Sequence, residues 1–143
     1  MELDDVVAEA TRLGMWAHIA TVTPTGEPHV VPVHPAWFEG RVYALVTPDS
    51  KKMRNLAVNP SVCLHWQVSE ATGFDSLIVW GTGTAVTEVD RKRRLWDGVF
   101  DYDLAMFSPG GPEAPETGFL EVTPSRALVL RQFGMGGRDE WRA

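Results

Sequence analysis

The sequence predicts a small, mainly β domain with inserted helices, closed as an antiparallel barrel and paired with a second copy. About six strand-like runs are interrupted by only a few helical ones. Most connections between strands are too short to hold the crossover helices of a parallel sheet. A chain of 143 residues can bury one core, but it is small beside a dinucleotide-sized ligand. We therefore expect a partner subunit to complete any such site.

The first part of the chain predicts a helix followed by a β-meander. Apolar residues recur at helical spacing from Leu3 to Leu13, and Gly14 can end that helix. Strand-like runs follow at 16–23, 28–38 and 41–46. Gly26 and Gly40 lie in the turns between these runs, where glycine readily adopts positive φ.

The rest of the chain alternates short helices with longer strands. Helices are predicted over 51–58 and from 91 to about 99, the second capped by Asp90. Strands are predicted at 62–68, 76–89 and 119–133, with a bend at Gly81 and Gly83 and an interruption at Pro124. The loop 107–118 is rich in Pro and Gly, and the tail 134–143 is Gly-rich and then polar. No linker or repeat divides the chain, so we expect one domain over 1–143.

Charge and cysteine content exclude several classes of function. The formal net charge of -6 argues against nucleic acid as the main partner, because binding the phosphate backbone needs a positive face. Cys63 is the single cysteine, which rules out an internal disulfide and favours a reducing compartment. The N-terminus does not resemble a signal peptide, and no apolar run reaches the ~18 residues of a membrane span. These features predict a cytoplasmic protein without a membrane partner.

The histidines do not predict a metal site or a nucleophile. His29 and His34 are five residues apart on one predicted strand and so face opposite sides of it. Zinc-type spacing with cysteine is absent. Cys63 and His65 share a strand face, but no residue nearby orients the imidazole as a base toward the thiol.

The segment Thr47–Leu56 predicts an anion site at the start of a helix. Lys51, Lys52 and Arg54 follow the capping residue, which is Ser50 or Asp49. The helix dipole is positive at that end, so each exposed cation there costs about 0.3–1 kcal/mol unless an anion is bound. Free backbone N–H groups, a hydroxyl and these cations could converge on one phosphate. The alternative is a solvated basic patch with an ordinary cap.

Several sequence pieces around this helix occur together in one known superfamily. They are ATV at 20–22, TPTGEP at 23–28, PHVVPV at 28–33, TPDSKK at 47–52 and MRNLAVNPSVCL at 53–64. In this combination the chain resembles the pyridoxamine-5′-phosphate-oxidase-like split β-barrel superfamily, from about residue 12 to 90. The resemblance implies a homodimer that binds FMN or the deazaflavin coenzyme F420 between its subunits.

The resemblance also implies which residues contact the cofactor. The flavin ring and ribityl chain would lie against Val30, Val31, Pro32 and Val33. The phosphate would be held by Thr47, Ser50, Lys51 and above all Lys52, with Asn55 near the ribityl chain. Trp80 and Gly81 would pack on the cofactor from the facing subunit, and Trp141 and Arg142 would close the pocket. The alternative for both tryptophans is ordinary core or interface packing.

The implied activity is hydride transfer to a small organic acceptor by a flavin-type cofactor. The pattern AHIATV resembles the deazaflavin-dependent reductases of the superfamily, so F420 is preferred and FMN is the alternative. The chain lacks the C-terminal Arg/His cluster that binds substrate phosphate in the vitamin B6 oxidase, which implies another substrate. A non-catalytic flavin or haem carrier, or a stress protein, is a further alternative. No catalytic residue is identified.

Two further segments have an ordinary and a functional interpretation. The basic run Arg91–Arg94 is expected to be a solvated helix face, with docking of an acidic cofactor tail as the alternative. The loop 107–117 is expected to be a mobile surface loop, with a substrate lid as the alternative.

Overall fold

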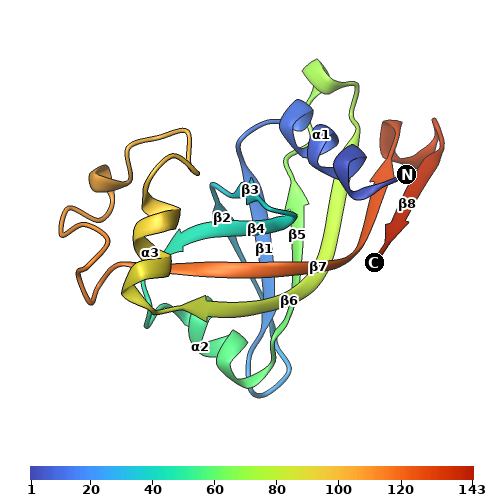
Figure 1. Ribbon diagram of the computed structural model, residues 1–143. Coiled ribbons are helices and arrows are strands. Elements are labelled where there is room, and N and C mark those ends of the chain that lie inside the picture. Colours follow the sequence, from blue (N-terminus) through green and yellow to red (C-terminus); the bar gives the residue numbers. More distant parts are fainter.

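Eight strands form one antiparallel sheet that curls into an open barrel in the computed structural model, which describes residues 1–143 (Figure 1). The strands are β1 Ala17–Val22, β2 Pro28–Val33, β3 Ala36–Phe38, β4 Arg41–Val46, β5 Ser61–Trp66, β6 Ser76–Val86, β7 Gly118–Leu130 and β8 Arg138–Arg142. The helices are α1 Leu3–Leu13, α2 Lys51–Val58 and α3 Val89–Trp96. No helix is long and apolar enough to cross a membrane.

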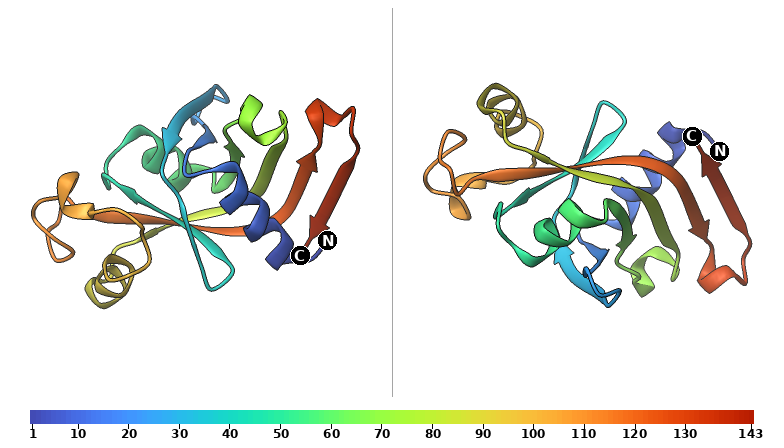
Figure 2. Two further views of the ribbon diagram at one scale, coloured as in Figure 1. Left: turned by 90° about the horizontal axis from the view of Figure 1, so that it is seen from above. Right: turned by 90° about the horizontal axis from the view of Figure 1, so that it is seen from below.

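The strand order is β2-β1-β5-β6-β7-β4-β3, and β8 pairs with β7 beside this path. The long strands β6 and β7 pair along their whole length, whereas β7 changes its second partner midway. Its first half pairs with β4 and its second half with β8. Figure 2 shows the result: α3 and the loop after it lie at one end of this ribbon, and β8 with both chain termini lies at the other.

The main core fills the barrel and follows the two-residue alternation of its strands. Ile19, Leu64, Val79 and Val129 are all at most 1% exposed and belong to one cluster of 20 buried residues. A second, smaller cluster around the fully buried Phe119 lies between the sheet and α3. Truncating such an aromatic side chain typically costs about 3–5 kcal/mol. The two clusters fix the barrel and the segment after α3 relative to each other.

The antiparallel, mainly β fold predicted from the sequence is confirmed, and α2 has the predicted bounds. The predicted strand 28–38 is wrong as a single element, because His34 and Pro35 separate β2 from β3. Proline lacks the N–H that would continue the ladder there. The third helix starts at Val89 with Glu88, not Asp90, in the capping position. The tail, for which no element was predicted, contains β8, which extends the sheet from β7.

The interruption expected near Gly81 and Pro124 is a β-bulge inside two continuous strands. The register between β6 and β7 shifts between Trp80 and Gly81, so that Ser125 on β7 has no opposite residue on β6. Pro124 stands opposite Gly81, where its missing N–H and its ring are accommodated by the irregularity. The bulge therefore lets a proline lie within a buried strand.

The basic run on α3 is not a uniformly solvated face. Lys92 is only 5% exposed, and its Nζ donates to the carbonyl oxygens of Ala114 at 3.1 Å and Thr117 at 2.8 Å. Arg93 pairs with Glu113 in the same loop. The expectation of a solvated face is wrong at Lys92, because the loop 107–117 folds over this side of α3 and supplies backbone acceptors.

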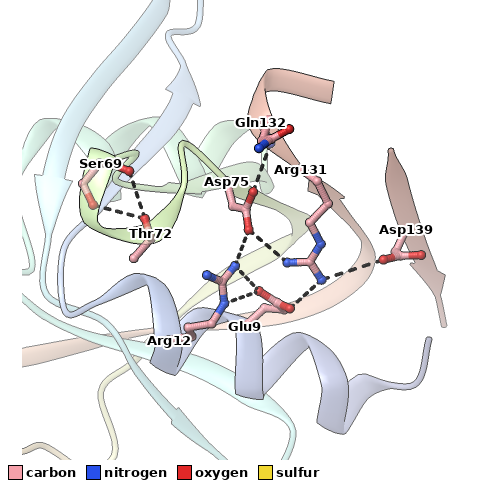
Figure 3. Close-up of polar contacts among 8 residues, drawn as sticks. All are labelled: Glu9, Arg12, Ser69, Thr72, Asp75, Arg131, Gln132 and Asp139. Atoms are coloured by element: carbon pink, nitrogen blue, oxygen red, sulfur yellow. Dashed lines mark hydrogen bonds and ion pairs between the residues drawn. The ribbon is translucent and has the colours of Figure 1, made fainter. Parts of the chain in front are cut away.

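A network of ion pairs joins α1 to the end of the β6–β7 ribbon that lies away from α3 (Figure 3). Arg12 contacts Glu9 at 2.8 Å and Asp75 at 2.7 Å, and Arg131 contacts Glu9 at 2.6 Å and Asp75 at 3.3 Å. Asp75 also accepts the backbone N–H of Gln132. The hydrogen bond from Arg131 lowers the pKa of Glu9, and the Gln132 N–H lowers the pKa of Asp75.

This network predicts a stability loss in acid. Both carboxyl pKa values are lower in the folded chain than their ordinary values of 4.5 and 3.8. The stabilisation is therefore fully present above those ordinary values, and it is lost below them as the pH falls through the lowered pKa values of the folded chain. Glu9→Gln should lower the free energy of unfolding by about 1–2 kcal/mol at pH 7 and flatten the acid side of the Tm–pH profile. Glu140→Gln, an exposed site on β8, is the control. Parallel profiles for Glu9→Gln and the unmodified protein between about pH 5 and 2, where the Glu9 carboxyl takes up its proton, would contradict this role.

Candidate functional site

A pocket of about 340 Å³ lies where the ends of β2 and β4 meet the start of α2. Its walls are formed by Trp16, Pro32, Val33, His34, Leu45, Val46, Thr47, Lys52, Tyr102, Phe107 and Ser108. Lys52 is the only Lys or Arg among them, and none is a carboxylate. The volume is near the lower end of the roughly 300–1,000 Å³ of ligand pockets. The pocket thus combines an apolar interior with one cationic end.

The start of α2 lies at that cationic end. The Ser50 backbone N–H donates to the Thr47 oxygen at 3.0 Å, a turn that leads the chain from β4 into the helix. Ser50 occupies the capping position with extended backbone angles, yet its side chain makes no capping hydrogen bond. Its Oγ is one of three buried side-chain polar atoms without a partner. The first turn of α2 carries no acidic residue. The helix start therefore offers donors that the chain itself does not use.

Lys52 is the charged group of the pocket. Its side chain is partly buried, and it forms no ion pair or hydrogen bond. Burial lowers the pKa of its ammonium group. A partly desolvated cation without a counter-charge is costly, and a bound anion would remove that cost. The unused Ser50 hydroxyl and the unpaired Lys52 together fit a phosphate group.

Aromatic rings form the opposite wall. His34 stacks on Tyr102 with ring centroids 4.3 Å apart, and Trp16 packs on His34 at 5.1 Å. Phe107 meets Tyr102 edge-on at 5.7 Å. Burial, and then the Asp101 carboxylate, raise the pKa of Tyr102, so its hydroxyl stays protonated. The wall offers flat apolar surface and one hydroxyl donor.

The structure brings four of the predicted site residues together in this pocket: Pro32, Val33, Thr47 and Lys52. Ser50 lies next to them at the helix start. Lys51 points into a neighbouring polar hollow that it shares with Arg54 and Asn55. Asn55 is 3% exposed and donates to Thr21 Oγ1 at 3.0 Å, which ties α2 to β1.

The other predicted residues lie outside the pocket of the single chain. Val30 is 57% exposed on the edge strand β2, and Val31 packs against the main core. Trp80 and Gly81 lie on β6, where the Arg126 guanidinium covers the Trp80 ring at 3.8 Å. Trp141 packs against the main core from β8. Their contact with a cofactor, from this or a facing subunit, stays a prediction.

Sequence reasoning missed the aromatic wall. The wall is built from Trp16, His34, Tyr102 and Phe107, which are far apart in the chain and share no spacing pattern. One usable signal was the loop after α3, because a lid was an alternative for residues 107–117, and Phe107 and Ser108 do line the pocket. No group of three or more His, Cys, Asp or Glu side chains is placed to hold a metal ion.

Comparison with known proteins places the chain in a family. The family model described as pyridoxamine 5′-phosphate oxidase matches residues 5–131. No curated protein sequence matches the chain.

Solved structures of low sequence identity share the fold. A Clostridium acetobutylicum protein related to general stress protein 26, of the pyridoxinephosphate oxidase family, has 18% identity and a TM-score of 0.77 over 99% of this chain and 96% of its own. A pyridoxamine 5′-phosphate oxidase-related, FMN binding protein from Nostoc punctiforme has 16% identity and a TM-score of 0.66 over 96% and 88%. A heme binding protein from Mycobacterium smegmatis has 14% identity and a TM-score of 0.72 over 98% and 57%.

Proposed function

Because the chain belongs to the pyridoxamine 5′-phosphate oxidase family, we propose that it is an oxidoreductase that binds a flavin-type cofactor by its phosphate at the start of α2. Two observations carry this proposal: Lys52 lines one end of an apolar pocket without a partner, and the Ser50 hydroxyl, two residues earlier at the start of the same helix, is buried without a hydrogen-bond partner. The substrate would be a small organic acceptor of hydride.

The chain's own residues would bind, orient and shield the cofactor. When bound, a flavin or deazaflavin ring supplies two-electron hydride chemistry. Lys52, Ser50 and Thr47 would hold the phosphate, while Pro32 and Val33 would border the ring and exclude water. Tyr102 keeps a proton on its phenol oxygen at the opposite wall, where it can hydrogen-bond to an acceptor.

Coenzyme F420 is the preferred cofactor, with FMN as the alternative. Lys51 and Arg54 form no ion pair, and they line a polar hollow of about 390 Å³ beside the first turn of α2. The Glu27 carboxylate also lines this hollow, so the cations outnumber the anion there. Two further cations next to the phosphate position favour a cofactor with a longer anionic side chain.

Titration with FMN, F420 and riboflavin tests the proposal. A phosphate held by Lys52 and Ser50 should make FMN bind at least about tenfold more tightly than riboflavin, which has the same ring but no phosphate. Equal affinities for FMN and riboflavin, or no binding of any of the three, would overturn it.

Oxidation of the reduced cofactor by an electron-poor acceptor then tests catalysis, and binding without turnover would favour a carrier. Absorption bands of haem in the purified protein would favour the haem-binding alternative.

We also propose a homodimer formed through the outer face of β1, β5, β6 and β7. Across this face Ala20, Cys63, Trp80 and Arg126 are neighbours on adjacent strands, and all are only partly buried. Val30 continues it on β2. A partner on this face would bury the exposed apolar area and bring its own Trp80 toward the cofactor.

A charge in the centre of this face should abolish the dimer. The unmodified protein is expected to sediment at twice the 15.8 kDa of one chain. Trp80→Glu should sediment as a monomer, because the carboxylate would be desolvated in the interface. Met135→Glu, at an 83% exposed site between β7 and β8, should remain dimeric. A dimeric Trp80→Glu variant would place the interface elsewhere.

A further inference from the structure

A second cavity, of about 420 Å³, lies under the C-terminal end of α1. α1 contributes Ala10 and Thr11, the following residues contribute Met15, and β3 contributes Trp37. Asp101, from the segment after α3, closes the other side. We call the pocket beside Lys52, proposed above to bind the cofactor, the flavin pocket. His34 is the only lining residue that the second cavity shares with it. The two cavities are thus neighbours separated by one imidazole ring.

The electrostatic character of this cavity is opposite to that of the flavin pocket. The last carbonyl groups of a helix lack intrahelical partners and carry partial negative charge, and here only the Ala10 carbonyl receives a bond, from the Gly14 N–H. Arg12 is the one cation in the last turn, but its guanidinium is bound to Glu9 and Asp75 in the network of Figure 3. No Lys or Arg lines the cavity, whereas the Asp101 carboxylate does. Its Oδ1 lies 3.0 Å from Nε2 of His34, which also lines the cavity, so the other oxygen, Oδ2, is the one left for a ligand.

Aromatic surface reinforces this preference for positive charge. Trp37 lies over the buried Trp66 with ring centroids 6.1 Å apart and an angle of 23° between the rings. Both rings line the cavity, and Trp37 is only partly buried. The face of an indole attracts cations more strongly than any other side-chain ring. Met15, at 51% exposed, leaves apolar surface at the rim.

We propose that this cavity binds an organic amine with an apolar body. The ammonium group lies between Asp101 and the C-terminal end of α1, within reach of the Trp37 ring, and the apolar body lies against Ala10 and Met15. The proposal goes beyond the redox function and does not depend on it, because no residue of the phosphate position takes part.

A charge series at constant shape tests the ligand class. The probes are phenethylamine, which is cationic at pH 7.5, its neutral analogue 2-phenylethanol and the anion 3-phenylpropanoate, titrated calorimetrically into the full chain without cofactor. The amine should bind saturably at roughly millimolar concentration. It should bind about tenfold more tightly than the alcohol, and the anion should not bind measurably. Equal binding of all three probes, or no saturable binding of the amine, would overturn the proposal.

Variants and indole signals locate the site. Asp101 is 75% exposed, so Asp101→Asn should fold normally and weaken the amine about fivefold without changing the alcohol. Asp97→Asn, at an exposed carboxylate four residues earlier that lines neither cavity, is the matched control. In ¹⁵N spectra the amine should shift the Trp37 indole signal, assigned with Trp37→Phe. Loss of affinity in Asp97→Asn equal to that in Asp101→Asn, or a shift confined to Trp80, would contradict this site. FMN affinity measured separately on the same variants keeps this result independent of the redox proposal.

Discussion

Lys52→Met is expected to weaken FMN binding by roughly 10- to 100-fold without lowering thermal stability. A charge-assisted hydrogen bond contributes about 1.5–3 kcal/mol, which corresponds to this range of dissociation constants. In the chain without ligand, burial lowers the pKa of Lys52 and no counter-charge compensates it. Methionine keeps much of the side-chain length and removes that cost. A loss of affinity together with unchanged or higher Tm would separate a binding role from a structural one.

Three comparisons sharpen this expectation. Arg138→Met removes the same unit of charge on β8, far along the chain from the pocket, and should leave FMN affinity unchanged. Lys51→Met, whose side chain points into the neighbouring hollow, should have a smaller effect than Lys52→Met. Riboflavin affinity should not respond to Lys52→Met, because riboflavin lacks the phosphate. If FMN and riboflavin lose affinity equally, Lys52 acts on the pocket's shape and not on a phosphate.

The pH dependence of FMN affinity has a direction that follows from the protonation of Lys52. Lys52 attracts an anion only while it is protonated, and its pKa lies below the ordinary value of 10.5. FMN affinity should therefore fall as the pH rises through the lowered pKa, earlier than for an exposed lysine. Lys52→Met should show no such fall, which assigns the titration to this residue.

The cationic half of the site could be predicted because it is local in sequence. Ser50 and Lys52 lie within one helical turn, and helix capping and the helix dipole depend only on that turn. The aromatic half could not, since Tyr102 reaches His34 only because the segment after α3 folds back over the sheet. That fold-back depends on Phe119 and its neighbours in the second core cluster, a contact that no spacing rule encodes.

The strands show the same division between local and distant causes. The turns at Gly26 and Gly40 set the first hairpins, and both glycines have positive φ as expected. The polar strand β8 has no alternating apolar pattern, so only its pairing with β7 makes it a strand. Lys92 looked like a surface residue because the loop that buries it lies more than twenty residues later in the chain.

Gly81→Ala is expected to destabilise the fold by about 3 kcal/mol or more. A Cβ on Gly81 would overlap the Thr123 carbonyl oxygen and lie 2.9 Å from the Thr123 carbonyl carbon and 3.1 Å from Pro124 Cα. These atoms belong to the backbone of β7 at the bulge, so no side-chain rotation relieves the overlap. Because β6 and β7 pair along their whole length, moving one strand away disturbs the centre of the sheet.

Gly83→Ala, two residues along the same strand, is the matched control for urea unfolding. Its Cβ would meet only side-chain methyl groups of Leu56 and Leu120, at 3.1 to 3.3 Å, and these can adjust at a cost of about 1 kcal/mol. Equal unfolding midpoints for the two variants would contradict a backbone cause.

FMN affinity of the folded fraction then decides why glycine stands at position 81. Affinity retained in folded Gly81→Ala would assign the residue to the bulge alone, whereas affinity lost in a folded dimer would favour the cofactor contact that the resemblance implies.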